Sequence, residues 1–297
     1  MISVRVYECN NNNNDINAMY DDDDPSMESF YSARSSLGDS IQPFVDQVLD
    51  EIEILAPGTL QSLRDTQEIK VAGREGEFLF AKRMVCAEKF NISKATSRAV
   101  EHASWRRENI PQGLPGLDEG EIEDQINDEK VYVQLETRSR RPCLIVRVKE
   151  HTAGLSDASV LKKFVIYCLE IATYLCDVDK YENPDCMIDV VFDARSMKWK
   201  NYDTHGLIQV FAVLVKAFPE RVHKIYMFQG PKLLDMLWKV VKPFVDPVSR
   251  EKVVFLNGSN GRDVLYDAIG HEFVPKDFLG IPIRECKDIV MKMWPIA

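Results

Sequence analysis

Hydrophobic residues in the first third of the chain recur at helical spacing. The clearest set, spaced three or four positions apart, is Phe44, Val45, Val48, Leu49 and Ile52. A second helix is predicted at 77–89, and a third is predicted to follow an N-terminal cap at Ser93. This part of the chain is therefore expected to be helical, from about residue 41 to residue 109.

After residue 120 the pattern changes to short apolar strands that alternate with long helices. Strands are predicted at 130–136, 142–148, 187–192, 222–228 and 252–256, and helices at 157–176, 202–218 and 232–241. Such alternation indicates βαβ units and a largely parallel sheet covered by helices. The helix at 202–218 is apolar on nearly every side, which predicts that it is buried.

The predicted helix at 232–241 is unusually apolar, with a polar edge of only Lys232, Asp235 and Lys239. One interpretation is an ordinary covering helix. The other is a lid whose inner face meets lipid and whose outer aromatic edge touches a membrane.

Two segments differ in composition from the rest of the chain. Residues 1–40 contain five consecutive Asn and four consecutive Asp, and such a segment buries too little apolar area to fold, so we expect a disordered acidic tail. A turn-rich linker from Pro111 to Gly120 then separates a predicted helical lobe at 41–115 from a predicted βα lobe at 116–297.

Charge and cysteine usage restrict the class of protein. The net charge is −10, of which residues 1–40 carry −6 through eight acids and two bases, so the rest carries only −4. Because nucleic-acid binding needs a basic surface, we expect no nucleic-acid partner. Seven cysteines without a C-x-x-C pair argue against a disulfide framework or zinc site. No apolar run is long enough to span a membrane, and the N-terminal residues lack the apolar stretch of a signal peptide. We expect a cytoplasmic protein.

Motifs for catalysis are absent from the sequence. It contains no G-x-S-x-G, no G-x-G-x-x-G and no phosphate-binding loop. His205 lies near Asp203 and His223 lies in a strand, but neither has a partner at H-E-x-x-H spacing. We therefore predict no enzymatic activity, no cofactor and no metal site.

Several short motifs, in a fixed order, resemble the CRAL-TRIO lipid-binding family, in particular its phosphatidylinositol transfer type. They are Glu88-Lys89-Phe90, Trp105-Arg106, Arg141-Pro142, Phe218-Pro219-Glu220-Arg221, Lys242-Pro243-Phe244-Val245-Asp246-Pro247, and Val274-Pro275 to Gly280. The resemblance implies an α/β fold in which an N-terminal helical lobe precedes a βα lobe. In that lobe a mostly parallel sheet floors an apolar cavity under a gating helix.

The resemblance also implies a headgroup site and a gate. The headgroup positions are Lys89, Glu220, Ser249 and Lys252, and the gate positions are Leu233, Leu234, Met236, Leu237, Trp238, Val241 and Phe244. The residue types suit the ligand, because two lysines neutralise a phosphodiester while a carboxylate accepts hydrogen bonds from inositol hydroxyls. The alternative is that both lysines are solvated and that Glu220 pairs with Arg221.

One departure from the family affects the second ligand. Ile188 and Val190 stand where the choline-lipid branch has small hydroxyl residues, so the sequence lacks the choline-lipid signature and leaves open whether the second ligand is phosphatidylcholine, a sterol or another apolar molecule. The resemblance implies a carrier that binds phosphatidylinositol, exchanges it with a second hydrophobic ligand at transient membrane contacts, and supports phosphoinositide synthesis. Alternatives are a carrier of a sterol, tocopherol or retinoid, and a scaffold that transfers no lipid.

Overall fold

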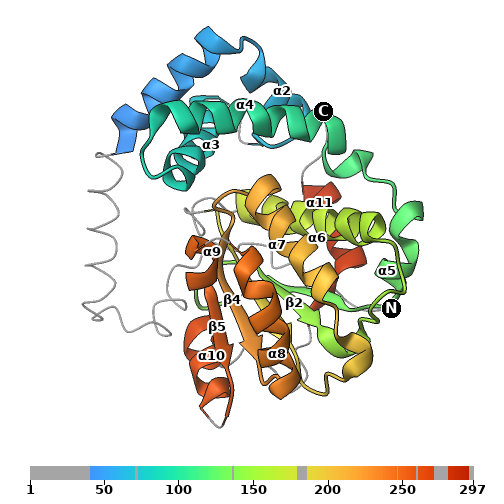
Figure 1. The fold of residues 1–297 in the computed structure, drawn as a ribbon. Coiled ribbons are helices and arrows are strands. Elements are labelled where there is room, and N and C mark those ends of the chain that lie inside the picture. Colours follow the sequence, from blue (N-terminus) through green and yellow to red (C-terminus); the bar gives the residue numbers. More distant parts are fainter. Residues whose placement is uncertain are drawn as a thin grey trace, which may run out of the picture. The chain divides into compact units, whose positions relative to one another are not determined.

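A computed structural model of the chain describes residues 41–70, 73–135, 137–178, 186–245, 247–258, 260–270 and 280–293. The chain forms two compact units, residues 1–43 and 44–297, and the second unit holds the elements described below (Figure 1). The predicted tail at 1–40 and the motif at Val274-Pro275 lie outside the described residues. The boundary predicted near residue 115 stays a prediction.

The helical segment comprises helical residues 41–55, of which 44–55 belong to the second unit, followed by α2 (Thr59–Asp65), α3 (Arg74–Ala87) and α4 (Ile92–Asn109). The predicted cap of α4 is wrong by two residues. Asn91, not Ser93, is the N-cap, and its side-chain oxygen accepts the backbone N–H of Lys94 at 3.0 Å. Asn is as good an N-cap as Ser, and it closes the first turn.

The five predicted strands form a mixed sheet with one further strand. The strands are β1 (Val131–Gln134), β2 (Cys143–Arg147), β3 (Ile188–Asp193), β4 (Val222–Phe228), β5 (Val253–Leu256) and β6 (Ile281–Pro282), in the spatial order β5-β4-β3-β2-β1-β6. Strands β2 to β5 are parallel, whereas β1 is antiparallel to both β2 and β6. The prediction of a mostly parallel sheet in an α/β fold is confirmed.

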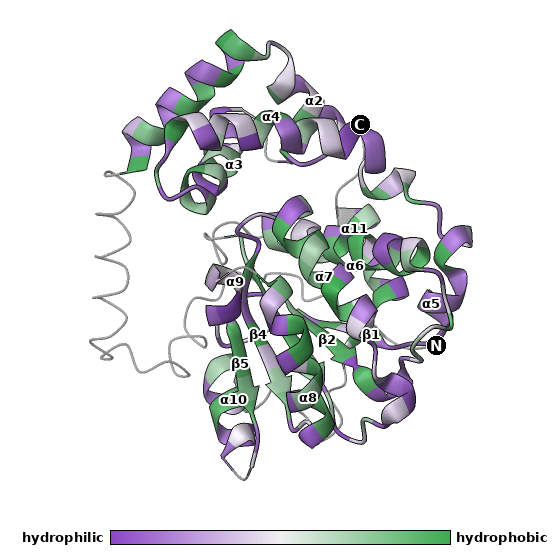
Figure 2. Cartoon of the chain, viewed as in Figure 1, coloured by the Kyte–Doolittle hydropathy of each residue, from purple (hydrophilic) through white to green (hydrophobic). Residues whose placement is uncertain are grey.

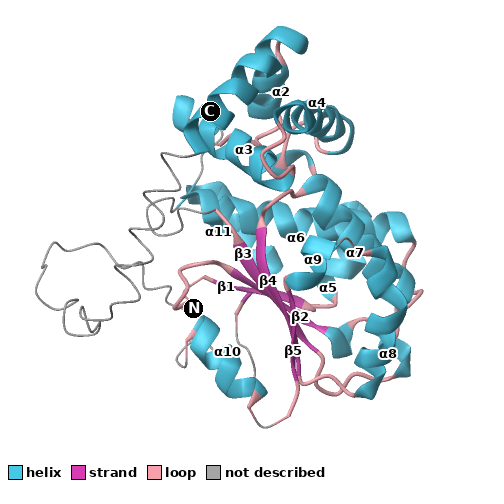
Figure 3. Cartoon of the chain, turned by 60° about the vertical axis from the view of Figure 1, so that its left-hand side comes forward, coloured by secondary structure: helices cyan, strands magenta, loops and turns pink. Residues whose placement is uncertain are grey.

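Helices cover both faces of this sheet, as Figure 3 shows. On one face lie α6 (Ala158–Val178), α7 (Thr204–Ala217), α8 (Lys232–Val241) and α11 (Ile283–Met293); on the other lies α10 (Gly261–Ile269). The short helices α5 (Glu123–Asn127) and α9 (Pro247–Glu251) complete the described set. Side chains alternate along each strand, so that in β2 Leu144 packs under α6 and α7, whereas Cys143 and Ile145 pack toward α10.

The expectation that the apolar helix at 202–218 is buried all round is only partly right. Figure 2 shows α7 as mostly hydrophobic, yet only four of its residues are buried, namely Gly206, Phe211, Val213 and Ala217. The other apolar residues are half-buried or exposed, and several of them line two pockets described below. The excess apolar surface of α7 thus faces cavities rather than solid core.

A buried charge network joins the helical segment to α6 and β4. The Arg106 guanidinium contacts Glu170 at 2.8 Å and Glu68 at 2.9 Å, and Arg221 contacts Asp177 at 2.7 Å. All five side chains are nearly or fully buried. Because removal of one partner leaves an uncompensated buried charge, each such contact costs about 3–5 kcal/mol to break. The network therefore fixes the segment that carries Lys89 relative to the strand that follows Glu220.

Candidate functional site: an apolar cavity and a charged pocket

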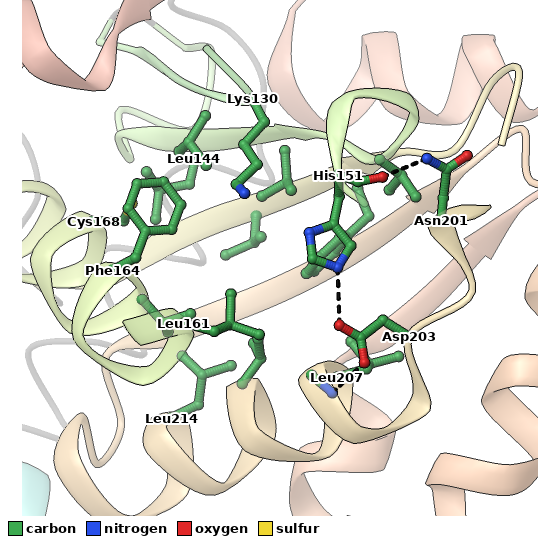
Figure 4. Close-up of a pocket in the computed structure, with 18 of the residues that line it drawn as sticks. Lys130, Leu144, His151, Leu161, Phe164, Cys168, Asn201, Asp203, Leu207 and Leu214 are labelled. Carbon is green, nitrogen blue, oxygen red and sulfur yellow. Dashed lines mark hydrogen bonds and ion pairs between the residues drawn. The ribbon is translucent and has the colours of Figure 1, made fainter. Parts of the chain in front are cut away.

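An apolar cavity of about 150 Å³ lies between the sheet and helices α6, α7 and α8 (Figure 4). The sheet contributes Val131, Leu144, Val146, Val190, Phe192 and Met227, and the helices contribute residues that include Leu161, Phe164, Leu169, Leu207, Val210, Leu214, Leu234 and Leu237. Val190 occupies one of the two positions where the choline-lipid branch has a hydroxyl. The wall is apolar at that position.

The cavity is small in this state. A cavity of about this volume takes up a molecule the size of benzene, whereas a diacyl lipid carries on the order of thirty methylenes that need cover from water. Two acyl chains therefore fit only if the side chains or helices around the cavity move apart.

Helix α8, which the family resemblance implies as the gate, forms one wall of the cavity. Leu234, Leu237 and Val241 are buried, with Leu234 and Leu237 on the cavity itself, whereas Met236 and Phe244 are 50% and 68% exposed. Leu233 and Trp238 are half-buried. The helix is thus strongly amphipathic. Its inner face lies on the cavity, and its outer face carries the exposed apolar side chains Met236 and Val240 beside Lys232 and Lys239. Movement of α8 remains a prediction.

Polar side chains gather at one end of the cavity, a grouping that the sequence analysis did not predict. His151 Nε2 lies 2.9 Å from Asp203 Oδ2, and the other Asp203 oxygen accepts the Gly206 N–H at 2.6 Å, which caps α7. The hydrogen bond from His151 lowers the pKa of Asp203. Figure 4 shows His151 and Asp203 pointing toward each other, and Lys130 reaching into the same space. His151 and Asp203 are 52 residues apart, so spacing in the sequence could not reveal the pair.

A second pocket, of about 450 Å³, is lined by all four predicted headgroup residues: Lys89, Glu220, Ser249 and Lys252. Lys252 Nζ contacts Glu220 Oε2 at 3.0 Å, and both side chains are about one-fifth exposed. Among the described residues the Lys89 ammonium has no ion pair or hydrogen bond. The fold brings the four residues together, and their role in binding stays a prediction.

The alternative pairing of Glu220 with Arg221 does not occur. Arg221 is buried and bonds to Asp177, while Glu220 faces the pocket and pairs with Lys252. Lys89 and Glu220 both have positive φ values, 50° and 51°. A non-glycine residue in this left-handed region costs of order 1 kcal/mol or more, and such strain is concentrated at functional sites.

Arg98 and Cys86 also line the charged pocket, and the sequence analysis missed both. Arg98 donates to Glu88 at 2.6 Å and to the backbone carbonyl of Val215 at 2.7 Å, which ties α4 to α7. Cys86 is exposed at this pocket. Arg98 lies in α4, eight residues after the Glu88-Lys89-Phe90 motif, so no local pattern in the sequence identifies it as a pocket residue.

The floor of the charged pocket is apolar and adjoins the cavity. Its floor includes Phe211, Leu214, Phe218 and Ile225, and Leu214 lines the apolar cavity as well. The Trp238 ring lies 5.7 Å from the Phe211 ring and so fills the space behind this wall. A ligand with a polar head in the charged pocket would therefore need to displace only α7 and α8 side chains to extend its tail into the cavity.

The part of the chain that the structure describes contains no cluster of three or more His, Cys, Asp or Glu side chains suited to a metal. His223, which the sequence left without a partner, lies 2.9 Å from Asp189. Within the same residues, no helix is both long enough and apolar enough to cross a bilayer.

The mixed sheet, the apolar cavity and the charged pocket define an α/β ligand-binding domain. A model of the CRAL/TRIO domain matches residues 126–280. The chain belongs to this family, whose members bind lipophilic ligands.

Known proteins agree with this assignment. A CRAL-TRIO domain-containing protein of Schizosaccharomyces pombe is 24% identical over 204 residues, which are 67% of this chain and 44% of the relative. "Protein real-time" of Aedes aegypti is 24% identical over 245 residues, or 74% of this chain and 36% of that protein. A Caenorhabditis elegans CRAL-TRIO domain-containing protein is 29% identical over 285 residues, or 89% and 36%. The chain thus spans less than half the length of these three relatives.

A solved structure shows the same fold. The crystal structure of Sfh5 aligns with a TM-score of 0.56 at 15% identity, and the alignment covers 84% of this chain and 96% of Sfh5. At that identity the likeness concerns the fold alone.

Proposed function

We propose that this protein is a lipid carrier that binds phosphatidylinositol and exchanges it with a second hydrophobic ligand between membranes. The observation that carries the proposal is the convergence of Lys89, Glu220, Ser249 and Lys252 on one pocket whose floor adjoins an apolar cavity. These residues come from the helical segment, the turn before β4 and the α9–β5 region, so only the fold brings them together.

The chemistry of the pocket suits an inositol phosphodiester. Lys89 and Lys252 supply two positive charges for the phosphate, while Glu220 and the Ser249 hydroxyl offer hydrogen-bond partners for inositol hydroxyls. Because Lys252 and Glu220 already lie 3.0 Å apart, one headgroup can contact both without a rearrangement of the backbone. Each charge-assisted bond contributes about 1.5–3 kcal/mol when it is desolvated.

The apolar cavity makes such a carrier possible. Exposure of a diacyl lipid to water would cost on the order of 25 kcal/mol at about 0.8 kcal/mol per methylene. A cavity as apolar as the bilayer removes this cost, so the headgroup contacts set selectivity. We expect the carrier to work at the cytoplasmic face of membranes, in transient contact with them, and to supply phosphoinositide synthesis without a catalytic step of its own.

A second candidate function is favoured by the lining of the cavity. The apolar wall at Val190 suits a ligand that is apolar along its whole length. A sterol, tocopherol or retinoid carrier is therefore the alternative for the resident ligand, and a scaffold that holds no lipid is the alternative from another class.

Transfer of labelled phosphatidylinositol between vesicles tests the proposal. We expect Lys252→Ala and Glu220→Gln each to slow transfer by about tenfold or more, which is the loss of one charge-assisted bond. The matched controls are Lys292→Ala and Glu101→Gln, which change the same charges at exposed positions of α11 and α4. Thermal unfolding confirms that each variant is folded. Equal transfer by the site variants and the controls would show that the headgroup assignment is wrong.

A further inference from the structure

Two short segments lie together beside the polar end of the apolar cavity. One contains the 3₁₀ turn Val148–Glu150 and the other contains the 3₁₀ turn Trp199–Asn201. The Asn201 side chain donates hydrogen bonds to the carbonyl oxygens of Lys149, at 3.2 Å, and of His151. These bonds hold the two segments together, and we call the pair the platform.

The outer side of this platform is apolar and basic at once. We call it the Trp199 patch, and it consists of Lys149, Leu155, Lys198, Trp199 and Lys200, all of which are exposed. Trp199 is 70% exposed and Leu155 is 65% exposed. The Trp199 ring contacts the Tyr202 ring, with centroids 5.6 Å apart, so it stands on a neighbouring aromatic ring rather than in the core.

The position of the patch relates it to the cavity. The two segments supply His151, Asn201 and Asp203 to the cavity lining, while α8 supplies Leu234 and Leu237 to the same lining. The Trp199 patch and the exposed side of α8 are therefore the outer surfaces of two walls of one cavity. A bilayer that contacts both would lie against the outer side of that cavity.

We propose that the Trp199 patch docks on the surface of a bilayer that contains anionic lipid. Tryptophan prefers the membrane–water interface, where its ring is apolar and its N–H is wet. Lysines near an anionic leaflet add about fivefold in affinity each. Glu150 Oε1 lies 3.3 Å from Lys149 Nζ and offsets its charge. The three lysines of the patch and Glu150 together therefore carry a net charge of +2. An acidic protein surface is the other occupant that this chemistry would fit, and vesicle binding that does not depend on the patch would favour it. The inference rests on the proposed carrier function and adds to it a docking surface outside α8.

Co-sedimentation of the full chain with vesicles tests this inference. The vesicles contain phosphatidylcholine alone, or phosphatidylcholine with phosphatidylserine. The charge variant Lys198→Ala with Lys200→Ala should bind phosphatidylserine vesicles about 25-fold more weakly, with little change on neutral vesicles. Trp199→Ala should weaken binding to both vesicle types by about tenfold. The controls are Leu55→Ala, which removes an exposed apolar residue, and Arg107→Ala with Lys292→Ala, which removes two exposed charges.

The same variants are also assayed for bound lipid after extraction. If the patch variants bind vesicles as well as the controls, the docking surface is wrong, whether or not lipid is carried. If vesicle binding depends on the patch but the wild-type chain holds no lipid, the docking surface stands and the carrier function fails. A stronger charge variant, Lys198→Glu with Lys200→Glu, should abolish binding to phosphatidylserine vesicles; undiminished binding would contradict the inference.

Discussion

Glu220 and Arg221 are neighbours in the sequence but belong to different parts of the structure. Arg221 points into the buried network, where it holds Asp177, and Glu220 points into the charged pocket, where it meets Lys252. Burial alone would raise the pKa of Asp177, but Arg221 and Lys70 keep that pKa below its ordinary value. Arg221 therefore anchors the left-handed turn that presents Glu220.

His102 is a second buried residue with a defined environment. Its ring lies between the rings of Phe80 and Trp105, at centroid distances of 6.0 and 6.2 Å, and its Nε2 is 3.6 Å from Glu68. Burial lowers the pKa of His102, although Glu68 opposes the shift. Since the folded protein then binds its proton more weakly than the unfolded chain, this group destabilises the fold as the pH falls below about 6.5.

The substitution His102→Phe should remove that part of the pH dependence. Phenylalanine keeps the ring contacts but has no proton to gain, so the free energy of unfolding should stay nearly flat between about pH 6.5 and 4.5. Below that range both proteins should lose stability. The pKa values of Glu68 and Asp177 are lower in the folded protein than in the unfolded chain, so the stability that these two carboxylates contribute is lost as the pH falls. Urea unfolding at a series of pH values measures this, and equal slopes for both proteins would refute it.

At the scale of the element, helix α8 shows which structural features the sequence could predict and which it could not. The pattern predicted its bounds of 232–241 correctly, because the contrast between apolar and polar positions is strong. The pattern could not decide between a covering helix and a cavity wall, since both bury Leu234 and Leu237. The cavity depends on which side chains of α6, α7 and the sheet face α8, and those contacts are long-range.

The two faces of α8 should respond differently to the same truncation. Leu237→Ala removes a buried side chain beside the cavity and should lower the free energy of unfolding by about 2–5 kcal/mol. Met236→Ala, one residue earlier but half exposed, should change it by less than about 0.5 kcal/mol. Urea denaturation of the purified variants provides the comparison. Similar losses for both would mean that α8 does not present Leu237 to a packed interior.

Other elements could not be predicted. Strand β6 has only two residues, Ile281 and Pro282, which is too short for any period to be visible. Its antiparallel pairing with β1 arises from tertiary packing alone. The partners His151 and Asp203 were also missed, because each is separated from the other by a full helix and strand. In contrast, the four residues that the family resemblance implies for a headgroup site all line the charged pocket, and their role in binding stays a prediction.

For the whole molecule, the central feature is the wall between the two pockets. Leu214 lines both, and Phe211 and Trp238 pack behind it, so the charged pocket and the apolar cavity are adjacent but separate in this state. The proposed carrier would open that wall when it loads lipid. The hydrophobic contacts that close it are replaced by contacts with acyl chains, so loading need not cost much free energy.

The most direct test is mass spectrometry of the lipids extracted from the purified full chain. We expect phosphatidylinositol and a second hydrophobic molecule in the wild-type protein. The double variant Lys252→Ala with Glu220→Gln should retain the second molecule and lose phosphatidylinositol, because only the head contacts are removed. A wild-type protein that releases no lipid, or one whose phosphatidylinositol content is unchanged in the double variant, would contradict the proposed carrier.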